Sequence, residues 1–150
     1  MTVLYVSETP VPSTQANSLQ ILKMCHYLNL NEEVERLTLL SFKGQSDLDL
    51  KRDFNASGFA HFTFPAWIQK FRYRLFLIPF YSLFFFWKSK YDLVFTRSIH
   101  VAALLNFMGI KVIYEIHKMP VPERRINYSL HRYIARKPKK ATIVSTNTNI

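Results

Sequence analysis

Short runs of consecutive apolar residues, many of them β-branched, recur along this chain and alternate with segments that have helical spacing. Such runs are typical of parallel strands that are buried on both faces of a sheet. The runs that we predict to be strands are residues 2–6, 34–41, 59–64, 91–96, 111–116 and 141–145. The chain is therefore expected to be an α/β domain with a Rossmann-like, doubly wound parallel sheet.

The segments between these runs predict the helices. Leu19 to Leu30 has helical spacing, with Asn17 or Ser18 as the capping residue. The other predicted helices are a short one over 48–54, a long apolar one over 67–90 that Pro79 should kink or interrupt, one over 99–107 that Gly109 ends, and a basic one over 123–135.

The length of the chain, 150 residues, is that of one domain. A doubly wound sheet should carry a helix after its sixth strand, but five residues follow Ser145. We therefore expect the domain over residues 1–150 to be incomplete at its C-terminal end, or another polypeptide to cover that face.

Cysteine content and the N-terminal residues bear on the compartment. Cys25 is the single cysteine, which excludes an intramolecular disulfide and a thiolate metal cluster. No basic region precedes the apolar run Val3 to Val6, and Ser7 to Pro10 ends that run at once, unlike a secretory signal. These features predict a cytoplasmic protein.

The net charge of +10 is unevenly distributed. Residues 1–65 carry 5 Lys and Arg against 7 Asp and Glu, whereas residues 66–150 carry 15 against 3. This asymmetry indicates an anionic partner such as a membrane surface, a nucleic acid or a phosphorylated substrate, or simply a basic face. No nucleic-acid recognition motif accompanies the charge, so we do not expect nucleic-acid binding.

Glycine positions argue against a dinucleotide oxidoreductase. A dinucleotide-binding domain needs glycines after the first strand, where the backbone approaches the pyrophosphate, and an acidic residue after the second. The glycines here are Gly44, Gly58 and Gly109, and Ser41 to Lys43 stands where the acid should be.

Ligands of parallel sheets bind beyond the carboxyl ends of the strands. At these positions the sequence offers Asn17 and Ser18 at a helix N-terminus, suited to capping, to an anion or to both. Arg97 follows a strand and is suited to a phosphate or carboxylate, although Asp92 is an alternative partner in a structural ion pair. Ser145 ends the last strand.

Glu115 and His117 lie two residues apart on a strand, so both side chains point to one face. A carboxylate and an imidazole in this arrangement can perform acid–base chemistry or bind a hydroxyl, or can be ordinary hydrogen-bonding residues. The other histidines show no ligand spacing with this pair, so no metal site is expected.

Leu75 to Trp87 is strongly apolar, lies between basic residues and is too short to span a bilayer. It fits an interfacial helix at an anionic membrane, or a buried helix of the core. The membrane-facing candidates are Arg72, Arg74, Leu77, Phe84, Trp87 and Lys88.

Four segments together resemble glycosyltransferase family 4. They are Val3 to Ser7 with the following Pro-containing loop and Ala16 to Cys25, then Tyr91 to Ser98, Val112 to His117, and Ala141 to Ser145. Their order and spacing agree over nearly the whole chain.

This resemblance implies the N-terminal, acceptor-side half of a GT-B enzyme. Members of family 4 transfer a sugar from a nucleotide-sugar with retention, usually without a metal ion, and commonly build lipid-linked or cell-surface glycans at the membrane. His117 matches the histidine that lines the family's catalytic cleft. The nucleotide-sugar would be a substrate, and no cofactor is expected.

Two departures from the family pattern matter. The first loop lacks the glycines that many members place beside the donor phosphates, and the donor-binding half is absent from these residues. We therefore expect the chain to be inactive alone and to act with a donor domain, which a separate chain can supply. The alternative is a non-catalytic, membrane-associated module or a truncated gene product.

Overall fold

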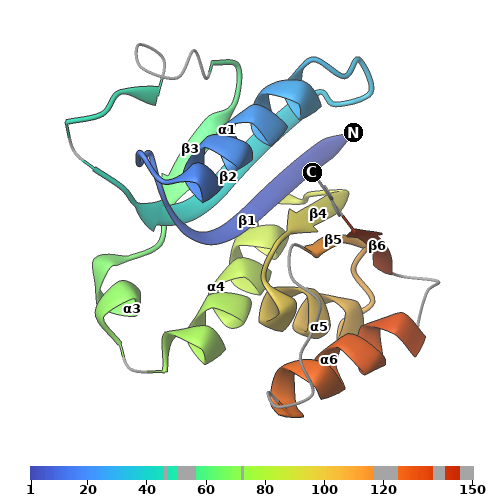
Figure 1. Cartoon of the computed structure of the whole chain (residues 1–150). Helices are drawn as coiled ribbons and strands as arrows, with labels where there is room; N and C mark the ends of the chain where they lie inside the picture. The colour runs from blue at the N-terminus through green and yellow to red at the C-terminus, as the bar shows by residue number, and fades with distance from the viewer. Residues whose placement is uncertain (46, 51–56, 72, 117–124, 137–140, 146–150) are drawn as a thin grey trace.

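A computed structural model describes residues 1–45, 47–50, 57–71, 73–116, 125–136 and 141–145. Within these residues one sheet contains six strands, β1 Thr2–Val11, β2 Arg36–Lys43, β3 Ala60–Thr63, β4 Leu93–Thr96, β5 Val112–Ile116 and β6 Ala141–Ser145. The strands lie in the order β3-β2-β1-β4-β5-β6, and all the pairs are parallel (Figure 1). The predicted Rossmann-like parallel sheet is confirmed.

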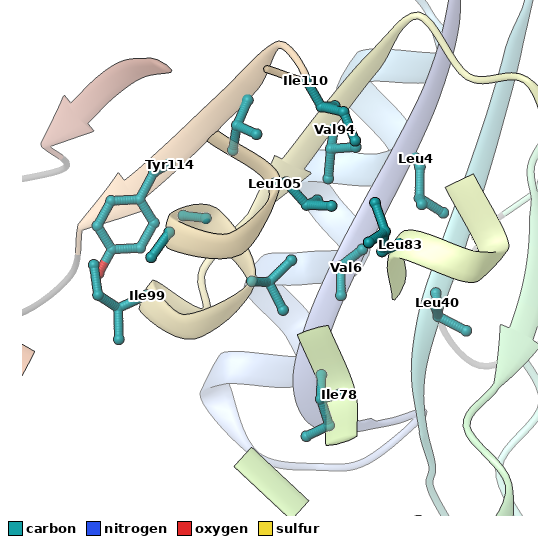
Figure 2. Packing of buried hydrophobic residues seen from close by; sticks show 14 of the residues in the cluster. Leu4, Val6, Leu40, Ile78, Leu83, Val94, Ile99, Leu105, Ile110 and Tyr114 are labelled. Carbon is teal, nitrogen blue, oxygen red and sulfur yellow. The ribbon is translucent and has the colours of Figure 1, made fainter. Parts of the chain in front are cut away.

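Helices cover both faces of this sheet (Figure 1). They are α1 Ala16–Asn29, α3 Ala66–Lys70, α4 Arg74–Ser89, α5 Ile99–Phe107 and α6 Arg125–Arg136. One core joins the sheet to α4, α5 and α6, and its packing is seen in Figure 2. The other core lies between α1 and the opposite face, so alternate residues of β1, such as Leu4 and Tyr5, belong to different cores.

The first strand is longer than the sequence predicted. It runs beyond Val6 to Val11, with a register irregularity against β2 between Val6 and Pro10. Its pairing with β4 ends at Val6, opposite Thr96. Pro10 lacks a backbone N–H, and it is tolerated because β1 is paired on one side only at this point.

The long helix predicted over 67–90 is divided into α3 and α4. The break does not lie at Pro79, which is inside α4; it follows α3 at Phe71, whose backbone is extended. Pro79 is buried, and Ser82 one turn later donates its hydroxyl to the Ile78 carbonyl at 2.8 Å. Burial of this face keeps the helix continuous through a residue that alone would disfavour it.

The remaining predicted elements agree closely with the structure. Helix α5 has the predicted bounds, and Gly109 follows it with φ 80°, a conformation that favours glycine. The predicted short helix over 48–54 begins at Leu50, and its residues 51–54 lie outside the described ranges.

Candidate functional site

A cleft of about 470 Å³ opens at the carboxyl edge of the sheet. It lies where β1 and β4 are neighbours, which is the point at which the strand order reverses. Open parallel sheets bind ligands at such a switch point. The cleft is lined by Ser7, Glu8, Thr9, Asn17, Leu75, Arg97, Ser98, Ile99, His100, Tyr114, Glu115, Asn127 and His131.

The turn between β4 and α5 is fixed by a chain of hydrogen bonds to β1. Thr96 donates its hydroxyl to the Val6 carbonyl at 3.0 Å, and its Oγ1 accepts from the Ser98 amide at 3.1 Å. Ser98 caps α5 by accepting from the Val101 amide at 3.4 Å, and its hydroxyl donates to Glu8. These bonds hold Glu8 and the start of α5 against each other at the cleft.

A largely buried ion pair also lines the cleft. The Nε of Arg97 lies 3.4 Å from Glu115 Oε2, and the two side chains are 12% and 6% exposed. Arg97 also donates to Gln20 of α1 at 3.1 Å, and the Tyr5 hydroxyl donates to Glu115 at 3.5 Å. An ion pair removed from water in this way requires such additional hydrogen bonds.

The alternative ion pair between Arg97 and Asp92 is wrong. Asp92 precedes β4 and accepts from the Thr2 amide at 2.7 Å, whereas Arg97 follows the same strand. The two residues lie at opposite ends of β4, so the carboxylate within reach of Arg97 is the one on the next strand, Glu115.

Burial shifts the pKa of Tyr114 and His131 in the cleft lining and of Tyr5, which contacts Glu115. Desolvation, with the charge of Glu115 as a smaller cause, raises the pKa of Tyr5 well above its usual value. Burial, together with the charge of Glu8, raises the pKa of Tyr114 to about 12. Burial lowers the pKa of His131, whose ring lies against that of Tyr114 with centroids 5.5 Å apart. Both tyrosines are therefore neutral donors near pH 7, and His131 is a neutral imidazole.

The cleft combines anionic side chains with the positive ends of two helices. Its described lining holds two carboxylates, Glu8 and Glu115, and one guanidinium, Arg97. Both α1 and α5 begin at the cleft, where Asn17 and Ile99 line it. Such a lining can accept hydrogen bonds from hydroxyl groups and donate others from amides and phenols.

The sequence-predicted residues divide into three groups. Arg97, Glu115 and Asn17 line the cleft together. Ser18 is fully buried, and its hydroxyl accepts from the Ser13 amide at 3.0 Å rather than lining the cleft. Ser145 pairs with Ile116 at the end of β6, and His117 lies outside the described residues.

The predicted capping of α1 by Asn17 or Ser18 is wrong. The N-cap is Gln15, which makes no side-chain cap bond, and the helix begins at Ala16. Asn17 and Ser18 are therefore inside the first turn, and the Ser18 amide donates to the Gln15 carbonyl at 2.9 Å.

Several cleft residues were not singled out from the sequence. These are Glu8, Ser98, Tyr114, Asn127 and His131. Glu8 and Ser98 fall in strand-end segments that the sequence did indicate, and Glu8 is the one acid between Ser7 and Ser18. Asn127 and His131 lie four residues apart on α6, a spacing that places them on one helix face.

The membrane-facing candidates lie on or beside α4. Phe84 and Trp87 are 58% and 59% exposed, and Arg74 and Lys88 are also exposed. Leu77, in contrast, is half-buried and packs on the core. Arg72 lies outside the described residues.

No helix in the described ranges combines the length and hydropathy needed to cross a bilayer. In the same part of the chain, no group of three His, Cys, Asp or Glu side chains is arranged to hold a metal ion.

Comparison with solved structures defines the class of fold. The chain has the fold of half of a GT-B glycosyltransferase, a Rossmann-like α/β domain. It is similar to the crystal structure of MurG from Acinetobacter baumannii, with a TM-score of 0.57 and 11% identity over 99% of this chain. It spans 42% of the MurG chain. No family model and no curated protein matches the sequence, so membership of family 4 stays a prediction.

Proposed function

We propose that this chain is the acceptor-side domain of a nucleotide-sugar-dependent glycosyltransferase. The observation that carries the proposal is the cleft at the switch point of a GT-B-like half, with Glu8, Arg97 and Glu115 in its lining. Cell-wall or other lipid-linked glycan synthesis is the setting we propose, because the similar structure is that of MurG.

The charges of the cleft favour the acceptor over the donor. A nucleotide diphosphate needs cations, but the described lining holds one guanidinium, and Arg97 is engaged by Glu115 and Gln20. Carboxylates accept hydrogen bonds from sugar hydroxyls. We therefore assign the donor to a second domain, which lies elsewhere in a longer protein or in a separate chain.

In this proposal the acceptor hydroxyl lies near Glu8 and Glu115. Its oxygen attacks the anomeric carbon of the donor sugar, the bond to the nucleotide diphosphate breaks, and the proton of the acceptor oxygen passes to the departing diphosphate. Cations of the donor domain would stabilise the charge on the departing diphosphate. His117 follows β5 directly and is proposed as the catalytic histidine that the family resemblance implies.

Saturation-transfer NMR with a panel of glycans and nucleotide-sugars tests the assignment of the cleft. We expect saturation transfer to a glycan, reduced at least tenfold in affinity by Glu8→Gln and by Glu115→Gln (~1.4 kcal/mol each). The matched control is Glu32→Gln, because Glu32 is exposed and does not line the cleft. Binding of nucleotide-sugars alone, with the same dependence on Glu8 and Glu115, would contradict an acceptor site.

A second proposal concerns the membrane. Phe76, Phe80, Phe84 and Trp87 recur at helical spacing along α4 and are 64%, 61%, 58% and 59% exposed. A solvent-exposed aromatic stripe with basic residues at both ends of the helix is typical of an interfacial helix. We propose that α4 docks on an anionic membrane surface, which would make the protein peripheral at the cytoplasmic face whether or not the chain is catalytic.

Sedimentation with liposomes tests the docking of α4. We expect binding to vesicles that contain anionic lipid, weakened by salt and by Phe84→Asp. Leu77→Asp is unsuitable as a test of docking because Leu77 packs on the core. Phe107→Asp is the control, since Phe107 is 70% exposed on α5 rather than on α4. Equal binding of all variants, or no binding at low salt, would exclude this surface.

A further inference from the structure

The two carboxylates of the cleft differ in their partners. Glu115 is paired with Arg97, whose Nε lies 3.4 Å from Glu115 Oε2. Glu8 is half-buried, and its Oε1 accepts from the hydroxyl of Ser98, which is a neutral donor. No described residue contacts Glu8 Oε2 or forms an ion pair with Glu8. The carboxylates of the described lining therefore exceed its guanidinium by one charge, in a protein whose net charge is +10.

The carboxylate of Glu8 is held in a fixed position at the cleft. Ser98 is the N-cap of α5, and its amide donates to the hydroxyl of Thr96 at 3.1 Å. Thr96 in turn donates to the Val6 carbonyl of β1, the strand that carries Glu8. The positive end of α5 stabilises the ionised carboxylate. Oε2 keeps its capacity to accept hydrogen bonds, so a ligand in the cleft can donate to it.

The neighbours of Glu8 in the cleft lining are uncharged aromatic groups. Burial and the charge of Glu8 raise the pKa of Tyr114 to about 12, so this phenol is neutral beside the carboxylate. The ring of His131 lies against that of Tyr114 and is neutral, because burial lowers its pKa. Neither group offers Glu8 a positive charge. The face of a tyrosine ring attracts cations, so this part of the cleft suits a positively charged group.

The chemistry of this position favours an organic ammonium over a metal ion. Divalent cations such as Ca²⁺ take six or more oxygen ligands, several of them from carboxylates. The described residues contain no group of three His, Cys, Asp or Glu side chains that could hold such an ion. An ammonium group needs fewer partners, and its charged N–H donors bind a carboxylate more strongly than a neutral hydroxyl does.

We propose that the acceptor carries an ammonium group, as an amino sugar with a free amine does, and that Glu8 binds this group. The inference rests on the proposed acceptor function and names the chemical class of the acceptor. Glu8 would determine specificity, because a sugar whose amine is acetylated carries no charge and offers the carboxylate a single neutral N–H. The excess negative charge of the cleft would then be matched by its substrate.

NMR titration of the unaltered protein near pH 7 with matched sugars tests the proposal. Glucosamine, glucose and N-acetylglucosamine form one set, and galactosamine, galactose and N-acetylgalactosamine form another. Each amine should bind about tenfold more tightly than its hydroxyl counterpart, because the hydrogen bond to Glu8 becomes charge-assisted. The acetylated sugars should bind no more tightly than the hydroxyl forms. Added salt should weaken binding of the amines and leave binding of glucose unchanged.

Variants of Glu8 assign the preference to its charge. Glu8→Gln should make glucosamine and glucose bind equally, whereas Glu8→Asp keeps the charge and should keep most of the preference. The glutamine oxygen can still accept from Ser98, and circular dichroism checks that each variant is folded. Glu32→Gln is the control, because Glu32 is exposed and does not line the cleft, and it should retain the tenfold ratio. The ratio of the two affinities is the readout, so a general loss of binding does not imitate the effect.

The outcomes separate this inference from the acceptor function on which it rests. A preference for amines that Glu8→Gln abolishes and Glu32→Gln leaves intact supports the inference. Equal affinities for glucosamine and glucose, or a preference that Glu8→Gln leaves unchanged, overturn it. Glucose binding that still requires Glu115 would in that case leave the acceptor function standing. If ethanolamine binds as tightly as glucosamine and Glu115→Gln changes neither affinity, the cleft recognises no sugar, and both proposals are overturned.

Discussion

The cleft and a neighbouring apolar groove of about 480 Å³ between α4, α5 and α6 share Leu75, His100 and Asn127 but are held in different ways. Cleft side chains are fixed by hydrogen bonds and an ion pair that join β1, β4, β5 and α1. Groove side chains come from three helices and lie partly in solvent, and the lining residues that the structure describes include no charged side chain. The polar side chains of the cleft are therefore held in place through the sheet, whereas the groove depends on packing between helices.

Disrupting the ion pair of the cleft should cause the largest loss of stability. Arg97→Met leaves Glu115, which is 5% exposed, without its cation, and should lower the free energy of unfolding by about 3 kcal/mol. Urea denaturation measures this loss. The double variant Arg97→Met with Glu115→Leu should recover most of it, and a loss below about 1 kcal/mol in the single variant would mean that the cleft does not depend on this pair.

A smaller loss is expected from the residue that links Glu8 to α5. Ser98→Ala removes the cap of α5 and the hydroxyl that donates to Glu8, and should lower stability by about 1–2 kcal/mol. Thermal unfolding should show a lower Tm, and Ser98→Thr should restore most of it because the hydroxyl is kept. Equal Tm values for Ser98→Ala and Ser98→Thr would contradict the role of the hydroxyl.

Acidification should weaken the fold at the cleft through His131. Burial lowers the pKa of this histidine below 6.5, so the unfolded chain takes up a proton at a higher pH than the folded chain. Stability should therefore fall as the pH drops from 7 through 6.5 and level off below the folded pKa. His131→Gln should reduce this dependence in urea titrations at several pH values. His61, whose pKa burial also lowers, contributes in the same direction, so His61→Gln is the parallel measurement.

The smallest effect should come from the groove. Phe80→Ser and Ile126→Ser replace side chains that are 61% and 71% exposed, and should change the free energy of unfolding by less than about 0.5 kcal/mol. Leu83→Ser on the buried face of α4 is the contrasting variant, because Leu83 is 7% exposed and packs in the core. If Phe80→Ser were as destabilising as Leu83→Ser, the groove rim would be part of the core.

Much of the fold could be predicted because the strands are buried on both faces and appear as unbroken apolar runs. The bounds of α5 and β6 follow from such runs and from Gly109. The extension of β1 to Val11 could not be predicted, because Pro10 signals a loop unless one knows that β4 ends beside Val6. The helix break at Phe71 could not be predicted either. Pro79 is the stronger local signal for a break, but its burial allows α4 to continue through it.

The location of the candidate site was predicted better than the contacts that its residues make. Parallel strands place their ends at one edge, which brings Arg97, Glu115 and Asn17 together. The pairing of Arg97 with Glu115 rather than Asp92 depends on which strand lies beside β4, and the sequence alone does not contain the strand order. Asn127 and His131 depend on how α6 packs, which is a tertiary property.

The central position of β1 also constrains how the domain folds. Its bonds to the β4 region, from Thr96 to Val6 and from Ser98 to Glu8, join residues 90 apart in the sequence. At about 5–20 residues per second, translation delivers the partner of β1 roughly 5–20 s after β1 itself. During that interval Val3 to Val6 lack one of their two neighbouring strands, so parallel pairing of this kind folds late and slowly. We therefore expect the cleft to be among the last features to form, and a chaperone that shields β1 to raise the yield of binding-competent protein more than the yield of soluble protein.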